Sequence, residues 1–357
     1  MGGGGGYNSG MLRIAIVGTG GVANYHATQF NGIPGCKVVA GCDVDEERVS
    51  AFCTKHTIPT FFTDLDVMLK ECEIDAVVVS TPDRFHAPVS LKAIKQKKHV
   101  LCEKPLAVNY AEASAMARAA KRAGVITMVH FTYRNAPVIH RAHEIIAAGE
   151  LGHIVHVDAS YLQSWLVSIE WGDWRKSPGL GWRLSTRHGS TGALGDLGVH
   201  LIDFVSYAAG DIKSVNAQLK AFTKIKGKKY GEYTLDANDS ALMQVEFKNG
   251  ALGMLHTTRW ATGHLNAIQL LICGTKGAIR INLDRSREKL EISTGEDMRP
   301  AKWKEMVCPA TPTIQERFVK SIRTGKNDQP DFKRGAEVQK VLDACFASNA
   351  SGKKVEI

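Results

Sequence analysis

The segment 12–30 constrains the fold more than any other part of the chain. An apolar, β-branched run at 12–17 leads directly into Gly18-Thr19-Gly20-Gly21-Val22-Ala23, and a helical pattern follows. Gly18 permits a tight turn, Gly20 lets backbone N–H groups approach a pyrophosphate, and Ala23 allows the helix to pack closely on the strand. The pattern predicts a buried parallel strand and a dinucleotide site at the helix N-terminus. The residues expected at the cofactor here are Gly18, Gly20, Gly21, Val22 and Ala23.

A second apolar strand, 37–42, ends at Asp43, which lies 25 residues beyond Gly18. A carboxylate at this strand end can accept hydrogen bonds from the ribose hydroxyls of NAD, and it would repel the 2′-phosphate of NADP. The alternative is that Asp43 caps the helix that begins near Asp45. We favour the ribose interpretation, so the predicted cofactor is NAD in preference to NADP.

Helices and strands continue to alternate up to residue 129. The expected strands are 60–62, 74–80, 98–102 and 125–129, and the expected helices are 45–56, 64–71, 87–96 and 110–124. Such alternation predicts right-handed crossovers and one parallel sheet. The turn Ser80-Thr81-Pro82 then ends its strand on the side of the glycine turn and is assigned to the cofactor. His86 either lies beside the cofactor ribose or is a partly buried histidine at a helix start.

The strand 98–102 ends in Glu103-Lys104-Pro105. Lys104 is therefore expected at the carboxyl end of a buried parallel strand, where open α/β sheets bind their ligands. Pro105 cannot continue the strand ladder because it has no N–H group. The alternative is a simple strand cap, in which Lys104 is solvated and paired with Glu103.

Composition narrows the class of protein. A chain of 357 residues is expected to form two domains. The formal charge of +9 is spread along the chain, and its densest cluster, 224–229, has no interleaved aromatic residues. We therefore expect a solvated hairpin or loop there and no nucleic-acid partner. No apolar run approaches the roughly 20 residues of a membrane-spanning helix.

Residues 1–10, with five consecutive glycines, are expected to be a leader or tag. Eight single cysteines without a C-x-x-C pair indicate free thiols and a cytoplasmic protein.

The second half begins with an expected strand at 153–161 and an irregular stretch at 162–190. This stretch contains four tryptophans with interspersed arginines, which either contact the faces and hydroxyls of a polyol or anchor the loop. Asp196 and His200 follow, four residues apart, so on a helix they share one face. Three interpretations are open for them: a metal site with Asp203, an ordinary helix start, or an acid-base pair.

After residue 210 the pattern changes to strands. They are expected near 215–223, 240–248, 251–258, 267–273, 277–282 and 289–293, with helices near 313–323 and 335–348. Asn249-Gly250 is a strong hairpin signal. The predicted fold is α/β, with an N-terminal Rossmann dinucleotide-binding domain and a C-terminal α+β domain built on a large, mostly antiparallel open sheet.

These motifs resemble the glucose-fructose oxidoreductase, inositol dehydrogenase and rhizopine-catabolism (Gfo/Idh/MocA) family over nearly all of 11–357. The resemblance rests on the glycine turn, on Thr81-Pro82 with His86, on Glu103-Lys104-Pro105 and on the D-x-G-x-H-x-x-D pattern from Asp196. It implies that Lys104 contacts both nicotinamide and substrate, that His200 is the acid-base residue with Asp196 as its neighbour, that Asp203 is structural, and that no metal is bound. It also implies a Rossmann domain at 11–133, a second domain at 134–357, and a homodimer or homotetramer formed by the second sheet.

The hypothesis is an NAD-dependent dehydrogenase that oxidises a secondary hydroxyl of a sugar, anhydrosugar or inositol-like polyol, or reduces the matching ketone. Alternatives are redox-assisted glycoside cleavage or aldose-ketose exchange with tightly held NAD(P), and a non-catalytic sugar-pathway regulator. The expected catalytic residues are Lys104, His200 and Asp196. The expected substrate contacts are Lys104, Tyr133, Trp182, Arg183, Asp196 and His200. The expected cofactor contacts beyond the glycine turn are Asp43, Ser80, Thr81, Pro82, His86, Glu103 and Lys104.

Overall fold

A computed structural model describes residues 10–357, with Pro178 described by its backbone only, so the expected leader lies outside the described residues except for Gly10. The chain divides into two compact units. The first runs to Thr132 and includes Pro312–Gln339, and the second comprises Tyr133–Thr311 and Lys340–Ile357. The segment 312–339 thus differs from its expected place in the second domain. The reason is packing, because Phe318 of helix α8 (Ile314–Thr324) lies edge-on to Phe30 of helix α1 (Gly21–Asn31) in one buried cluster.

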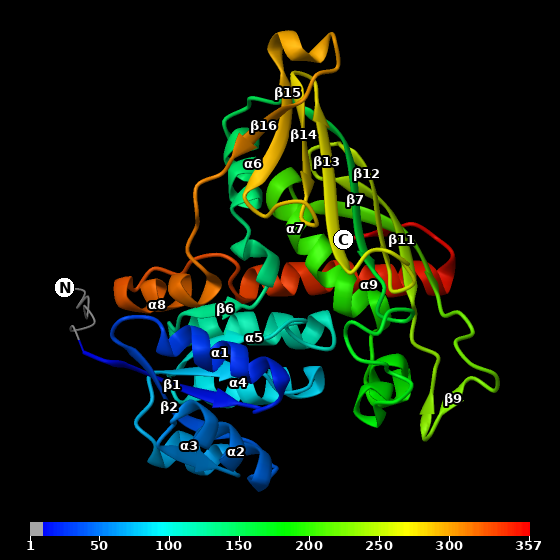
Figure 1. Cartoon of the computed structure of the whole chain (residues 1–357). Coiled ribbons are helices and arrows are strands. Elements are labelled where there is room, and N and C mark those ends of the chain that lie inside the picture. The colour runs from blue at the N-terminus through cyan, green and yellow to red at the C-terminus, as the bar shows by residue number, and fades with distance from the viewer. Residues whose placement is uncertain (1–9) are drawn as a thin grey trace. The chain divides into compact units, whose positions relative to one another are not determined.

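The first unit contains a six-stranded, fully parallel sheet in the order β3-β2-β1-β4-β5-β6. Figure 1 shows helices α1, α4 and α5 beside it. Its strands are β1 (Leu12–Val17), β2 (Cys36–Cys42), β3 (Thr60–Phe62), β4 (Ala76–Val79), β5 (His99–Cys102) and β6 (Thr127–Val129). Its other helices are α2 (Glu46–His56), α3 (Leu65–Glu71), α4 (His86–Lys95) and α5 (Tyr110–Ala123), with a short η1 (Asp83–Phe85). This is the doubly wound arrangement predicted from the alternation.

The register of this sheet brings four loops to one edge. Val17 is the last residue of β1, and it lies opposite Cys42 of β2 and Val79 of β4. Val79 in turn lies opposite Cys102 of β5. The loops that begin at Gly18, Asp43, Ser80 and Glu103 therefore leave the sheet side by side at its carboxyl edge, which is where such sheets bind ligands.

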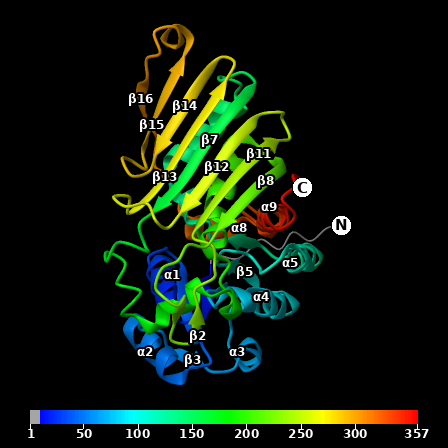
Figure 2. The same cartoon turned by 90° about the vertical axis from the view of Figure 1, so that its right-hand side faces the viewer.

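The second unit is built on a nine-stranded sheet in the order β16-β15-β14-β13-β7-β12-β11-β8-β17. Figure 2 views this sheet from the face opposite α7. Only β7 and β12 pair in parallel, so the expected mostly antiparallel open sheet is confirmed. The strands are β7 (Ile154–Gln163), β8 (Ile212–Lys220), β11 (Ser240–Phe247), β12 (Leu252–Thr258), β13 (Asn266–Gly274), β14 (Gly277–Asn282), β15 (Lys289–Thr294), β16 (Lys304–Val307) and β17 (Val355–Glu356), and β9 (Lys229–Tyr230) with β10 (Tyr233–Thr234) forms a separate hairpin.

Alternation along the strands separates the two faces of this sheet. In β11, Met243 and Val245 are buried whereas Leu242 is half exposed. Helix α7 contacts β7 and β13 on the buried side, and α6 packs against α7 and β15. The helical segments are η2 (Thr132–Asn135), α6 (Pro137–Ala147), η3 (Pro178–Leu184), η4 (Thr186–His188), η5 (Leu194–Gly198), α7 (Val199–Ala209), η6 (Gly295–Met298) and α9 (Phe332–Ser351), the last of which begins in the first unit.

Two further expectations can be compared with residues 10–357. No helix in this part of the chain has the length and apolar character needed to cross a membrane. The basic cluster 224–229 is not wholly solvated, because Lys224 Nζ lies 2.8 Å from Asp239 Oδ2 and both side chains are fully buried. The reason is that the buried carboxylate of Asp239 needs a counter-charge.

Candidate active site

The glycine turn after β1 is shaped to receive a ligand at the start of α1. Gly18 has φ +84°, and a Cβ there would lie 2.7 Å from the backbone nitrogen of Thr81, so only glycine fits. A Cβ at Gly20 or Gly21 would meet nothing within 4 Å. Gly20 caps α1 without a side-chain hydrogen bond, which leaves the first N–H groups of the helix available for an anion. Val22 is 40% exposed and Ala23 is buried, as the packing role of Ala23 requires.

Asp43 is tied to the glycine turn. Its Oδ2 accepts hydrogen bonds from the Thr19 N–H at 2.8 Å and the Thr19 hydroxyl at 3.1 Å, and its Oδ1 accepts the Asp45 N–H. The alternative role as the cap of α2 is wrong, because Asp45 is the N-cap and accepts the N–H of Arg48. Asp43 therefore keeps its carboxylate at the sheet edge and fixes the shape of the turn.

The turn after β4 supports the glycine turn from the other side. Ser80 Oγ donates to the carbonyl of Gly18 at 2.6 Å. The hydroxyl of Thr81 is buried and makes no hydrogen bond within the described residues, so it is available to a bound cofactor. Pro82 is the N-cap of η1. These observations, together with the open side of Gly20, fit a dinucleotide whose pyrophosphate lies at the start of α1.

His86 is the first residue of α4 and is buried. Its Nδ1 lies 2.7 Å from the carbonyl oxygen of Pro105, and its Nε2 lies 2.8 Å from the carbonyl oxygen of Thr81. Carbonyl oxygens only accept hydrogen bonds, so both ring nitrogens must carry protons and the ring is an imidazolium. Burial alone would lower the pKa of His86, but Cys102, Asp83 and the Pro105 carbonyl together raise it to about 10. Both nitrogens are engaged, so His86 joins the two turns. Its place at the start of α4 fits the helix-start interpretation, and a position beside a cofactor stays a prediction.

Glu103 and Lys104 follow β5 as expected, and their surroundings differ. Lys104 is half-buried, whereas Glu103 is buried with its Oε1 between His26 Nε2 at 2.9 Å and His130 Nδ1 at 2.7 Å. Its Oε2 accepts the backbone N–H of Lys104 at 3.2 Å. The Glu103 carboxylate is thus bound by two histidines and a backbone N–H. The alternative of a simple strand cap, in which Glu103 pairs with a solvated Lys104 side chain, does not describe this carboxylate.

In the second unit, Asp196 and His200 are not on one regular α-helix. Asp196 lies in η5, which is a π-helical turn, and His200 lies in the first turn of α7. The π-turn follows Gly192, which has φ +70° and where a Cβ would lie 2.4 Å from the Asn238 amide nitrogen. A π-turn is wider than an α-helical turn. The shared helix face that four-residue spacing predicts for Asp196 and His200 is therefore changed.

His200 is buried against a tyrosine cluster. The ring of Tyr133 lies edge-on to it, with centroids 5.0 Å apart, and the ring of Tyr161 lies at 6.4 Å. The two tyrosine hydroxyls and Asn266 form a closed set of hydrogen bonds of 2.5 to 2.8 Å. Burial raises the pKa of Tyr161, so its hydroxyl stays protonated. Tyr133 was expected at the site, whereas Tyr161 and Asn266 were not.

Asp196 has an arginine partner that the sequence did not indicate. Arg259 is buried and its Nη2 donates to Asp196 Oδ2 at 2.8 Å, while Arg183 Nη1 lies 3.8 Å from the same oxygen. Arg259 follows β12 directly, so the available signal was a charged residue at the end of a strand. A carboxylate held by arginine remains ionised and fixed in orientation.

Asp203 has a structural environment. Both of its oxygens accept hydrogen bonds from Arg134, at 2.7 Å each, and both side chains are buried. Among the described residues, Asp196, His200 and Asp203 are not a set of side chains close enough to share an ion, which counts against the metal alternative.

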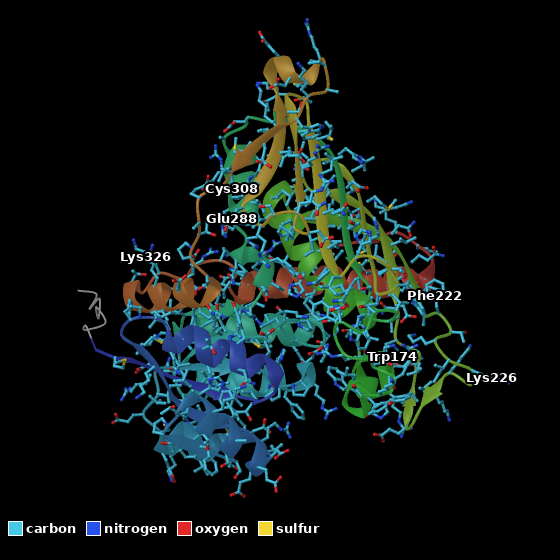
Figure 3. The ribbon with its side chains drawn as sticks, viewed as in Figure 1. Trp174, Phe222, Lys226, Glu288, Cys308 and Lys326 are labelled. Atoms are coloured by element: carbon cyan, nitrogen blue, oxygen red, sulfur yellow. The ribbon has the colours of Figure 1, made fainter. Side chains whose placement is uncertain are left out.

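The tryptophan-rich loop is anchored mainly by two of its indoles. Trp165 and Trp174 are buried in a cluster with Leu166, Leu184 and Leu235. Figure 3 labels Trp174 on the segment between β7 and α7. Trp182 is half-buried, and the guanidinium of Arg183 lies 4.9 Å from its ring centroid. The anchoring role thus applies to the first pair, and Trp182 with Arg183 stays a predicted substrate contact.

A parallel dinucleotide-binding sheet joined to a large open sheet, with a lysine at the first sheet's edge and a histidine in the second unit, defines a two-domain oxidoreductase. Residues 12–131 match a family described as the oxidoreductase family with an NAD-binding Rossmann fold, and residues 139–280 match the GFO/IDH/MocA C-terminal domain. The chain belongs to the Gfo/Idh/MocA family of oxidoreductases, which act on CH–OH groups.

Its relatives include sugar dehydrogenases. Levoglucosan dehydrogenase from Pseudarthrobacter phenanthrenivorans is 27% identical, over 97% of this chain and 98% of that protein. A structure of levoglucosan dehydrogenase in complex with NADH and levoglucosan matches with a TM-score of 0.88 and 26% identity, covering 97% of this chain and 99% of that one. An oxidoreductase domain protein from Kribbella flavida matches with a TM-score of 0.87 and 31% identity, over 98% and 99% of the two chains.

The buried His26 generates a prediction about stability and pH. Burial lowers the pKa of His26 below its ordinary value of 6.5, and the histidines lower the pKa of Glu103 well below 4.5 against the opposing effect of burial. Both groups bind fewer protons folded than unfolded, so acidification favours unfolding, from about pH 6.5 downward for His26. We expect the free energy of unfolding in urea to fall between pH 7.5 and 5.5, and to fall less in His26→Gln. His153→Gln, at an exposed site, should retain the wild-type slope. Equal slopes for wild type and His26→Gln would contradict the prediction.

Proposed function

We propose that this protein is an NAD-dependent dehydrogenase that oxidises a secondary hydroxyl of a sugar, anhydrosugar or inositol-like polyol, or reduces the matching ketone. The observation that carries the proposal is the open glycine turn on the same sheet edge as Lys104. The second unit adds the buried His200 and, four residues before it in the sequence, the carboxylate of Asp196 held by Arg259. A similar protein is known in complex with NADH and levoglucosan, which supports this substrate class.

The chain's own residues account for the proton chemistry in this proposal. His200 takes the hydroxyl proton, and the Lys104 ammonium stabilises the developing alkoxide. Asp196, held ionised by Arg259, orients His200 and favours its protonated form. Bound at the glycine turn, NAD would accept the hydride. Trp182, Arg183 and Tyr133 would contact the sugar ring and its hydroxyls.

We expect Lys104→Ala and His200→Ala each to lower kcat by about 10²- to 10⁴-fold, because each removes a group that handles the proton or the alkoxide. NADH binding, measured by fluorescence titration, should stay close to the wild-type value. Lys95→Ala, an exposed lysine on α4, is the control and should keep its turnover. Unchanged turnover in both site variants would refute the proposed mechanism.

The preference for NAD is tested by reduction assays with NAD and NADP in parallel, across anhydrosugars, monosaccharides, inositols and sugar phosphates. We expect faster turnover with NAD. Asp43→Ser should narrow the NAD/NADP ratio of kcat/KM about tenfold or more, since close like charges repel by a few kcal/mol and about 1.4 kcal/mol is tenfold. Asp66→Asn, an exposed acid on α3, is the matched control. A wild-type preference for NADP would show that Asp43 does not select the cofactor.

We also propose that the chain forms a homodimer or homotetramer through the second sheet. The face opposite α7 carries Leu242, Leu252 and Met254, of which the two leucines are 50% and 61% exposed. Exposed apolar side chains on a sheet face favour burial against a second copy.

Light scattering coupled to size exclusion should give two or four times the chain mass. Leu242→Lys combined with Leu252→Lys should shift the protein toward the monomer, because the charges would have to be buried. Lys121→Ala, an exposed residue of α5 in the first unit, serves as the control. A monomeric wild type would contradict the proposal.

A further inference from the structure

Four buried polar side chains meet behind Lys104, and all belong to the first unit. Glu103 follows β5, His26 lies on α1, His130 follows β6, and Gln315 lies in the first turn of α8. Their residues are between 0% and 8% exposed. Glu103 Oε1 contacts His26 Nε2 at 2.9 Å and His130 Nδ1 at 2.7 Å. Gln315 Nε2 contacts the other nitrogen of each ring, His26 Nδ1 and His130 Nε2, at 3.2 Å.

The direction of each hydrogen bond follows from the donors available. An ionised carboxylate only accepts, so His26 Nε2–H and His130 Nδ1–H both donate to Glu103. The amide NH₂ of Gln315 only donates, so the remaining nitrogen of each ring is an acceptor. Both histidines are therefore neutral, each with a fixed tautomer, and the cluster carries the single negative charge of Glu103. Burial lowers the pKa of His26, which agrees with a neutral ring at that position.

A metal ion is the other arrangement that such residues suggest. Within residues 10–357, His26, Glu103 and His130 are the one set of three His, Cys, Asp or Glu side chains close enough to share an ion. The Glu103 oxygen, however, lies directly between the two ring nitrogens at hydrogen-bond distance. A metal would instead require all three donor atoms at about 2.0–2.2 Å from a common centre. The hydrogen-bonded cluster is the arrangement that the distances support.

This cluster reaches Lys104 through the backbone. Glu103 Oε2 accepts the Lys104 N–H at 3.2 Å, and on the other side the Pro105 carbonyl accepts from His86 Nδ1 at 2.7 Å. The backbone on both sides of Lys104 is thus held by buried polar side chains. A carboxylate that is itself fixed by two histidines can hold the Lys104 N–H in one direction.

We propose that His26, His130 and Gln315 are positioning residues that set the placement of Lys104 by locking the Glu103 carboxylate. The proposal rests on the proposed function, in which Lys104 stabilises the substrate alkoxide. Its consequence is that groups that touch neither cofactor nor substrate control kcat, because a misplacement of about 1 Å in a reacting group can cost about 10²-fold.

The experiment uses the full chain and compares variants that lose or keep the donor to Glu103. His130→Leu and His26→Leu remove it, whereas His130→Asn and His26→Gln place an amide N–H near the position of the imidazole N–H. The assay uses levoglucosan, or the compound that reduces NAD fastest in the screen. We expect the leucine variants to lower kcat by about 10- to 100-fold with KM and NADH affinity little changed. The amide variants should recover most of the wild-type kcat. His99→Asn, at the opposite end of β5, is the control and should match wild type.

Rates are expressed per NADH-binding site, so loss of folded protein does not count as loss of kcat. If the leucine variants do not fold, Gln315→Met decides the question, because it removes both amide donors at similar volume and should also lower kcat. Wild-type kcat in Gln315→Met and in the leucine variants, with Lys104→Ala inactive, would overturn this proposal alone. Full activity of Lys104→Ala would overturn the proposed function and this proposal with it. A stoichiometric metal in the purified protein, lost in His130→Asn, would replace the positioning role with a metal site.

Discussion

The first unit depends most on the hydrogen bonds that stabilise the buried carboxylate of Glu103. Moving an ionised carboxylate out of water costs several kcal/mol unless partners replace its hydration. Here the partners come from α1, from the end of β6 and, through Gln315, from α8. Gln315 is 289 residues from His26 in the sequence. The hydrogen bonds around the Glu103 carboxylate therefore link α8 to α1, the helix that follows the glycine turn. This link explains in part why 312–339 belongs to the first unit.

The second unit uses buried charge in the same way. Arg134 holds Asp203 in a bidentate pair, which joins the start of the unit to α7. Arg259 holds Asp196 from the end of β12. Removing Arg134 would break an ion pair that is buried on both sides, and such a loss commonly costs about 3–5 kcal/mol. The two aspartates of the D-x-G-x-H-x-x-D motif, Asp196 and Asp203, are thus paired with arginines from other elements. The motif depends on these arginines for its stability.

Local pattern predicted the elements well and their partners poorly. The strands 60–62 and 277–282 were placed at their observed bounds, and the loops at Gly18, Asp43, Ser80 and Glu103 were placed at one sheet edge, because periodicity and turn residues are local signals. Arg259 as partner of Asp196, the burial of Lys224, the π-turn at Asp196 and the docking of α8 were not predictable. Each depends on a contact between residues distant in sequence, and no single segment encodes such a contact.

The charge of each of the three buried histidines near Lys104 follows from the groups that contact its ring nitrogens. His86 faces two carbonyl oxygens and must be an imidazolium, whereas His26 and His130 share a carboxylate with an amide behind them and are neutral. The backbone of Lys104 thus lies between one buried negative charge, on Glu103, and one buried positive charge, on His86. The two charges are of opposite sign, so the frame around the lysine carries no net charge. A neutral frame that fixes the backbone on both sides leaves the side chain of Lys104 to respond to its substrate, which is the condition a lysine needs if it is to stabilise charge that appears only during the reaction.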